Sequence, residues 1–172
     1  MLKPVQEPYN GPVSLPLAAS LEALATQAAR NTGATDLNSP YGYGDSVGFV
    51  AGQIVKITGE SSVTVVDLPS STGDDPYGML ADGFIDTLKS GKASVYPLSF
   101  GGTFKVKECY DVAQTYTVGT KLTFIPSGTN AGKLTPASVY GTQFIVARVT
   151  EAPASAADDD EMEIELLYQV EV

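Results

Sequence analysis

The segment QFIVARV (residues 143–149) and the segment MEIELLYQVEV (residues 162–172) give the clearest strand signals in this chain. The first is long and apolar enough to be a central strand, and the second alternates apolar with polar residues. Such alternation is typical of a strand with one buried face. An acidic loop joins the two segments, so we expect two consecutive strands, the second of which closes the body of the protein.

The same pattern continues upstream as far as residue 47. Further strands are expected at 47–57, 61–68, 93–100, 103–109, 116–125 and 133–135. Residues 76–85 are ambiguous between a strand and a helical turn, but their glycines favour a strand. Gly101-Gly102 predicts a tight hairpin. Roughly seven to nine short strands without long helices between them predict an all-β barrel or sandwich.

Residues 1–46 have a different character, because proline and glycine recur there and favour turns or extended backbone. Leu17, Leu21 and Leu24 share one face at helical spacing, which predicts a short helix at about residues 17–31. We therefore divide the chain into an N-terminal arm, residues 1–46, and a β-barrel domain, residues 47–172. A helix this short needs a surface to pack on, either its own barrel or a neighbouring molecule, and we favour the neighbour.

The arm also supplies the candidate interface residues. Tyrosine suits interfaces, because its ring offers a large contact area and its hydroxyl tolerates partial contact with water. The alternative is that the same residues pack a loop onto their own molecule. The candidates are Tyr9, Val13, Leu15, Leu17, Leu21, Leu24, Tyr41 and Tyr43.

Composition argues against catalysis. The 172 residues include no histidine, no tryptophan and one cysteine, Cys109, which removes most nucleophilic triads and most zinc or copper sites. We expect Cys109 to be a buried structural thiol, and we expect no enzyme activity, no cofactor and no metal. The acidic run at residues 158–161 could offer oxygen ligands to Ca²⁺ or Mg²⁺, but it lacks the spacing of a calcium loop. A solvated loop is the favoured interpretation.

Charge and hydropathy limit the partners. The formal net charge of −10 repels phosphate backbones and offers no basic patch to anionic membranes, so neither nucleic acid nor membrane is expected as a partner. The sequence has no apolar run long enough to span a bilayer, and we expect no secretory signal at residues 1–4, because no hydrophobic stretch follows them. A lone cysteine suits assembly in a reducing cytoplasm.

Three segments together resemble a known family. YTVGTKLT (116–123), GKLT (132–135) and FIVARV (144–149), followed by a last strand from residue 162, resemble the C-terminal half of tailed-bacteriophage capsid decoration proteins, also called cement or head-stabilising proteins. PYGML (76–80) and SGKASV (90–95) are similar to the middle strands of that family. The resemblance covers about residues 47–172.

The resemblance implies a small β-tulip-like barrel on the outer surface of a phage head, made in the host bacterial cytoplasm. The implied partner is the major capsid protein, bound across neighbouring subunits by a homotrimer. Removing residues 1–46 should then leave a folded barrel that binds weakly. Two alternatives stay open: another virion component, such as a tail-tube or head-completion protein, and a carbohydrate-binding module.

Overall fold

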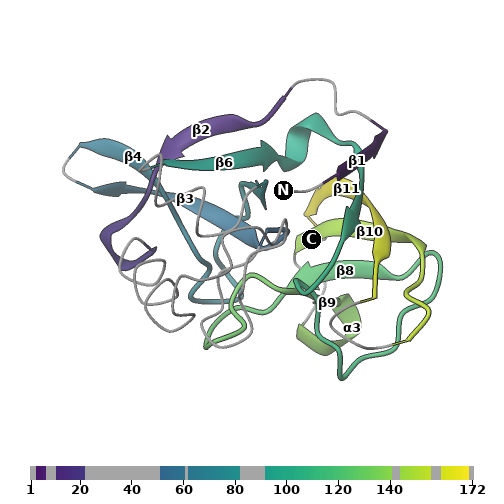
Figure 1. Ribbon diagram of the computed structural model, residues 1–172. Helices are drawn as coiled ribbons and strands as arrows, with labels where there is room; N and C mark the ends of the chain where they lie inside the picture. The colour runs from purple at the N-terminus through teal and green to yellow at the C-terminus, as the bar shows by residue number, and fades with distance from the viewer. Residues whose placement is uncertain are drawn as a thin grey trace, which may run out of the picture.

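The computed structural model describes residues 3–6, 11–21, 51–60, 62–81, 92–140, 144–155 and 160–170 (Figure 1). Its strands form two antiparallel sheets, which confirms the predicted all-β class. The six-stranded sheet has the order β1 (Lys3–Gln6), β7 (Thr103–Val106), β11 (Met162–Val170), β10 (Phe144–Glu151), β8 (Lys121–Phe124) and β9 (Leu134–Pro136). The five-stranded sheet has the order β2 (Val13–Pro16), β6 (Lys92–Pro97), β5 (Gly78–Leu80), β3 (Ile54–Glu60) and β4 (Val63–Asp67). The described residues also form a 3₁₀ turn, η1 (Leu98–Phe100), and a short helix, α3 (Ala137–Tyr140).

The two C-terminal strands form the centre of the six-stranded sheet. The central position of β10 was predicted from its sequence, whereas β11 was expected only to close the body. Ala147 lies opposite Leu166, and Val149 lies opposite Ile164. The register shifts between Ile145 and Ala147, so that two residues of β11 face one residue of β10. Such a bulge bends the strand and redirects a side chain. Tyr168 lies at this bulge and is 47% exposed.

The five-stranded sheet closes on itself. β2 and β4 are its two edges, and a parallel bridge joins Leu17, just after β2, to Val66 of β4. The amide of Ala18 donates to the carbonyl of Val66 at 2.8 Å. Closure satisfies backbone groups that an open edge would expose to other chains. The sheet is therefore barrel-like, and the N-terminal segment completes it.

This closure corrects the predicted division of the chain. The described parts of residues 1–46 are not a separate arm, because β1 pairs with β7 of one sheet and β2 pairs with β6 of the other. Residues 19–21 are helical, as predicted for the start of the helix. Residues 22–31, the rest of that helix, lie outside the described residues.

Two cores explain why the middle strands of the five-stranded sheet are apolar on both faces. Ile54, Met79 and Tyr96 belong to the large core between the two sheets. Their neighbours in the same strands, Val55, Leu80 and Val95, belong to a second, smaller core. The buried residues of this second core are Ala18, Leu21, Val55, Val65, Val66, Leu80, Ala93 and Val95. Successive side chains of a strand point to opposite faces, so strands buried on both sides lose the polar alternation of a surface strand.

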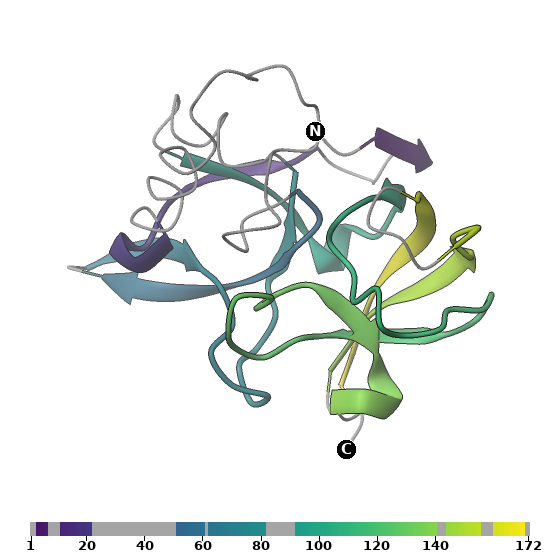
Figure 2. The ribbon, with the colours of Figure 1, turned by 60° about the horizontal axis from the view of Figure 1, so that its bottom comes forward.

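The β8–β9 loop fastens the two sheets together. Figures 1 and 2 show it reaching from the six-stranded sheet towards the start of β3. The amide of Ile54 donates to the carbonyl of Gly132 at 2.7 Å, and Nε2 of Gln53 donates to the carbonyl of Ala131 at 2.8 Å. Gln53 is fully buried, and its amide is satisfied by this contact. We call this set of contacts the inter-sheet latch.

Several expected boundaries are wrong. Gly101-Gly102 does not form a hairpin, because β6 and β7 lie in different sheets and the chain crosses between them after η1. Residues 51–52 form a turn, so the strand expected at 47–57 begins only at Ile54, and residues 47–50 lie outside the described residues. Residues 116–120 are a loop that precedes β8, and helix α3 was not expected.

Candidate functional site

The described interface candidates pack mostly on their own molecule. Leu21 is 1% exposed and belongs to the second core, so the prediction that it faces a partner is wrong. Val13, Leu15 and Leu17 are partly buried and pack against the same core. Barrel closure is the reason, because it brings the segment after β2 onto the apolar side chains of β4. Tyr9, Leu24, Tyr41 and Tyr43 lie outside the described residues.

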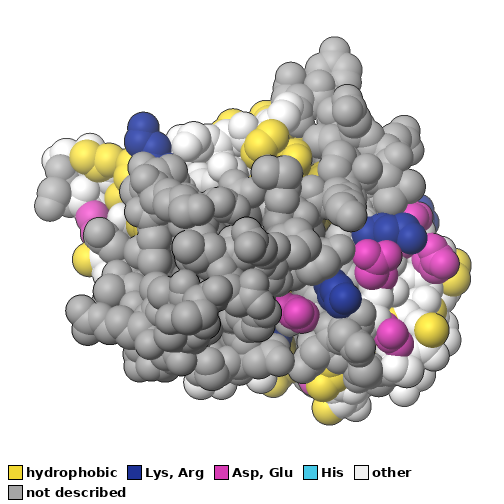
Figure 3. Space-filling model, viewed as in Figure 1, with side chains coloured by type: hydrophobic (Ala, Val, Ile, Leu, Met, Phe, Trp, Pro, Cys, Tyr) yellow, Lys and Arg dark blue, Asp and Glu magenta, His cyan; other side chains and the backbone are white. Residues whose placement is uncertain are grey.

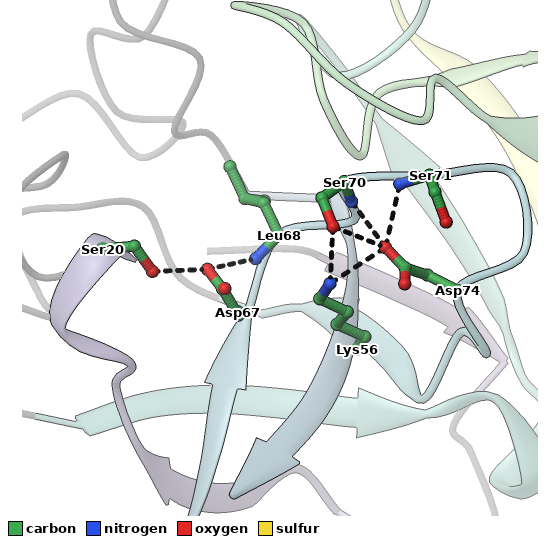
Figure 4. Close-up of polar contacts among 7 residues, drawn as sticks. All are labelled: Ser20, Lys56, Asp67, Leu68, Ser70, Ser71 and Asp74. Atoms are coloured by element: carbon green, nitrogen blue, oxygen red, sulfur yellow. Dashed lines mark hydrogen bonds and ion pairs between the residues drawn. The ribbon is translucent and has the colours of Figure 1, made fainter. Parts of the chain in front are cut away.

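Polar contacts hold the helical turn at residues 19–21 against the β3–β4 hairpin. The amide of Ala19 donates to both carboxylate oxygens of Glu60, at 3.4 and 3.3 Å. The hydroxyl of Ser20 donates to Oδ1 of Asp67 at 2.9 Å, and the amide of Leu68 donates to the same oxygen at 2.9 Å (Figure 4). The acids of the hairpin therefore have structural partners within the chain.

Asp74 is the hub of a second polar cluster, in the loop after β4. Its Oδ2 accepts from the amides of Ser70 and Ser71 at 2.6 and 3.0 Å, and from Nζ of Lys56 at 2.9 Å (Figure 4). Partial burial favours the neutral acid, but these bonds to the charged form outweigh it. They hold the pKa of Asp74 well below its ordinary value. This carboxylate closes a loop and is not placed to transfer protons near neutral pH.

Cys109 is fully buried, as predicted. Burial raises the pKa of its thiol to about 12, so the nucleophilic thiolate is scarce at physiological pH. No second cysteine is present in the sequence to form a disulfide with it. The thiol therefore behaves as a small apolar side chain of the large core.

The acidic run at 158–161 is described only at its end. Asp160 accepts hydrogen bonds from the amide and the hydroxyl of Ser155, and these bonds lower its pKa. Residues 158 and 159 lie outside the described residues. Among the residues that the structure does describe, no three His, Cys, Asp or Glu side chains are grouped so that they could hold a metal ion.

Exposed apolar side chains mark the β3–β4 hairpin. Ile57 is 44% exposed and Val63 is 50% exposed, and residues 57–60 are all exposed. The hairpin extends beyond the body at the left of Figure 1, and Figure 3 shows apolar side chains on this projection. Elsewhere in the described part of the chain, large exposed apolar side chains are Val118, Val139, Tyr140 and Tyr168.

A groove of about 270 Å³ is lined by residues of β3, the loop before β5, η1 and β11. It combines apolar side chains with a carboxylate, and the hydroxyl of Tyr168 donates to Oδ1 of Asp75 at 2.9 Å. This bond holds the phenol proton and raises the pKa of Tyr168. The residues that line the groove are Ile57, Asp75, Pro76, Tyr77, Leu98, Ser99 and Tyr168.

Sequence reasoning missed this groove. Tyr168 and Asp75 are 93 residues apart, and each lies in a segment that reads locally as a strand or a turn. The one local signal is the pair Leu167-Tyr168, which breaks the alternation of the last strand at the bulge.

The comparisons with known proteins add no family. No family model matches the chain, and no curated protein is significantly similar to it. Among the described residues, no helix has the length and apolar character needed to cross a bilayer.

Proposed function

We propose that this chain is a virion structural protein: a capsid decoration protein that binds the major capsid protein on the outer surface of a phage head, as a homotrimer and without catalytic activity. The observation that supports this best is the placement of the family-like segments. The C-terminal ones supply β8, β9, β10 and β11, which are neighbours in the order β11-β10-β8-β9 of one sheet, and the two middle ones supply β5 and β6, which are neighbours in the other sheet. A motif scattered over about 50 residues is thus a single structural unit.

The chemistry of the described side chains also favours binding over turnover. The one thiol is buried, and Asp74 and Asp67 are engaged in structural hydrogen bonds. The described surface also carries apolar area, part of it on a projecting hairpin, where Ile57 and Val63 are about half exposed. Such area is suited to docking on another protein.

A weak contact of each hairpin is sufficient for capsid binding when several copies of the hairpin bind together. Burying the exposed part of one valine contributes about 1 kcal/mol, or roughly fivefold in affinity. Three copies of the hairpin in a trimer would engage the lattice together, so that these increments multiply. The acidic surface would keep free copies apart before they meet the shell.

The test is co-sedimentation with purified heads that lack the protein, with Val63→Gln and Val139→Gln as a matched pair. Val63 lies on the hairpin and Val139 on α3, and they are 50% and 44% exposed. We expect Val139→Gln to bind like the natural protein and Val63→Gln to bind roughly 100-fold more weakly, since three contacts each lose about fivefold. Binding by apolar contact should persist at salt concentrations that screen surface charge.

Two results would overturn the proposal. One is failure of the natural protein to sediment with heads at any salt concentration, and the other is an equal loss in both variants. Deleting residues 1–46 is not a usable test, because it removes β1 and β2 and so opens the barrel.

A further inference from the structure

The groove between the β3–β4 hairpin and β11 has the composition of a side-chain receptor. Pro76 and Leu98 are buried beneath it, Tyr77 is half-buried, and Tyr168 is exposed at its edge. Asp75 is exposed and supplies a negative charge. We propose that this groove binds an arginine side chain presented by an extended segment of another protein.

The Tyr168–Asp75 hydrogen bond prepares the site. It joins β11 of one sheet to the loop before β5 of the other, at 2.9 Å, and so restrains both the ring and the carboxylate. The bond uses Oδ1 of Asp75, and Oδ2 remains as an acceptor for a ligand. A receptor whose groups are already in position loses less conformational entropy on binding.

A guanidinium matches these groups. Its flat face stacks on aromatic rings, its edge donates to a carboxylate, and its three-carbon stem packs on apolar surface. Lysine lacks the planar face, so it should bind more weakly. The neighbouring Asp74 does not compete for the ligand, because Lys56 already neutralises it at 2.9 Å.

Charge indicates that the partner is a different protein and not a second copy. The chain has 20 acidic and 10 basic residues, so a second copy offers few cationic side chains to this groove. It contains two arginines, Arg30 and Arg148, and Arg148 is paired with Glu165 on its own sheet. Arg30 lies outside the described residues, and binding of that arginine by a second copy is therefore an outcome that the test must separate.

The experiment is an NMR titration of the full chain with the peptide acetyl-Gly-Leu-Arg-Leu-Gly-amide. Saturable shifts should gather on the amides of Ile57, Tyr77 and Tyr168. The same peptide with lysine should bind at least threefold more weakly, and the peptide with citrulline, which is planar but neutral, at least tenfold more weakly. Equal binding of the citrulline peptide, or shifts spread over the surface, would overturn the proposal.

Variants separate the groove from general electrostatic attraction. Asp75→Asn should weaken binding of the arginine peptide at least fivefold, and Tyr168→Phe about twofold, because the ring stays but its tether to Asp75 is lost. The controls are Glu151→Gln and Tyr140→Phe, which alter an exposed acid and an exposed tyrosine away from the groove. An equal loss in Glu151→Gln and Asp75→Asn would refute a specific site.

Sedimentation velocity of the chain alone tests whether the groove binds Arg30 of a second copy. The natural chain should remain unassociated through this groove, and oligomers lost on Arg30→Gln and on Asp75→Asn alike would contradict our choice of partner. None of these measurements uses a capsid. The groove can therefore fail while the proposed capsid function stands, and the reverse also holds.

Discussion

Replacing Gly132 with alanine should break the inter-sheet latch. Gly132 has a φ of +80°, and an added Cβ would lie 2.5 Å from the carbonyl oxygen of Ile54 and 3.3 Å from Cβ of Gln53. The first distance is far inside van der Waals contact, and the atom met is backbone. The β8–β9 loop must therefore move away from the start of β3.

The cost has two parts. A left-handed backbone costs a residue with a Cβ about 1–2 kcal/mol. Moving the loop also breaks the bonds from Ile54 to Gly132 and from Gln53 to Ala131, both at buried positions, and each loss costs about 1 kcal/mol or more. The sum is about 3–5 kcal/mol, a large share of the roughly 5–15 kcal/mol that stabilises a typical domain.

Urea unfolding followed by circular dichroism measures this loss, and Gly128→Ala is the matched control. Gly128 lies in the same loop with a φ of +85°, but an added Cβ there meets nothing within 4 Å. We expect the control to lose only the backbone cost of about 1–2 kcal/mol. If the two variants lose equal stability, the clash and the latch contribute nothing, and the reasoning is refuted.

Two further predictions concern buried or engaged groups. Cys109 should not react with a thiol reagent at pH 8 in the folded protein, because burial raises the pKa of its thiol to about 12. In denaturant it should react fully. Reaction of the native thiol faster than global unfolding would contradict this prediction. Asp74→Asn should cost about 1 kcal/mol at pH 7. The folded pKa of Asp74 is depressed, so its contribution is present above the unfolded value of about 4 and is lost as pH falls towards the folded value. The urea midpoints of the natural protein and of Asp74→Asn should therefore converge at low pH. A difference between the two midpoints that stays constant down to the lowest pH would contradict a stabilising role for the ionised Asp74.

The strands that sequence predicted best are those with one consistent chemical pattern. β7 alternates buried Phe104 and Val106 with Lys105, and β11 alternates buried Met162 and Ile164 with glutamates. In these segments the apolar residues lie on the face towards the core and the charged residues on the other face. A local pattern was therefore enough to predict them.

The errors arose where structure depends on a distant partner. Gly101-Gly102 has the composition of a hairpin turn, yet the strands on either side of it do not pair with each other. β6, before it, pairs with β5, and β7, after it, pairs with β11. The groove was missed for the same reason, because Asp75 and Tyr168 meet only once two sheets pack. Pairing between remote segments is set by the whole fold and leaves little trace in either segment.

The N-terminal segment shows why an arm and an edge strand are hard to tell apart. β2 has four residues, and its sequence VSLP follows Pro12 and ends in Pro16, so by itself it is typical of extended backbone. Its role depends on β6, about 80 residues away, and on the bridge from Leu17 to Val66 that closes the barrel. Because closure uses the apolar side of this segment for folding, contact with a partner falls to side chains that folding leaves exposed. In the described part of the chain, Ile57 and Val63 on the β3–β4 hairpin and Tyr168 of β11 are among the large apolar side chains that meet this condition.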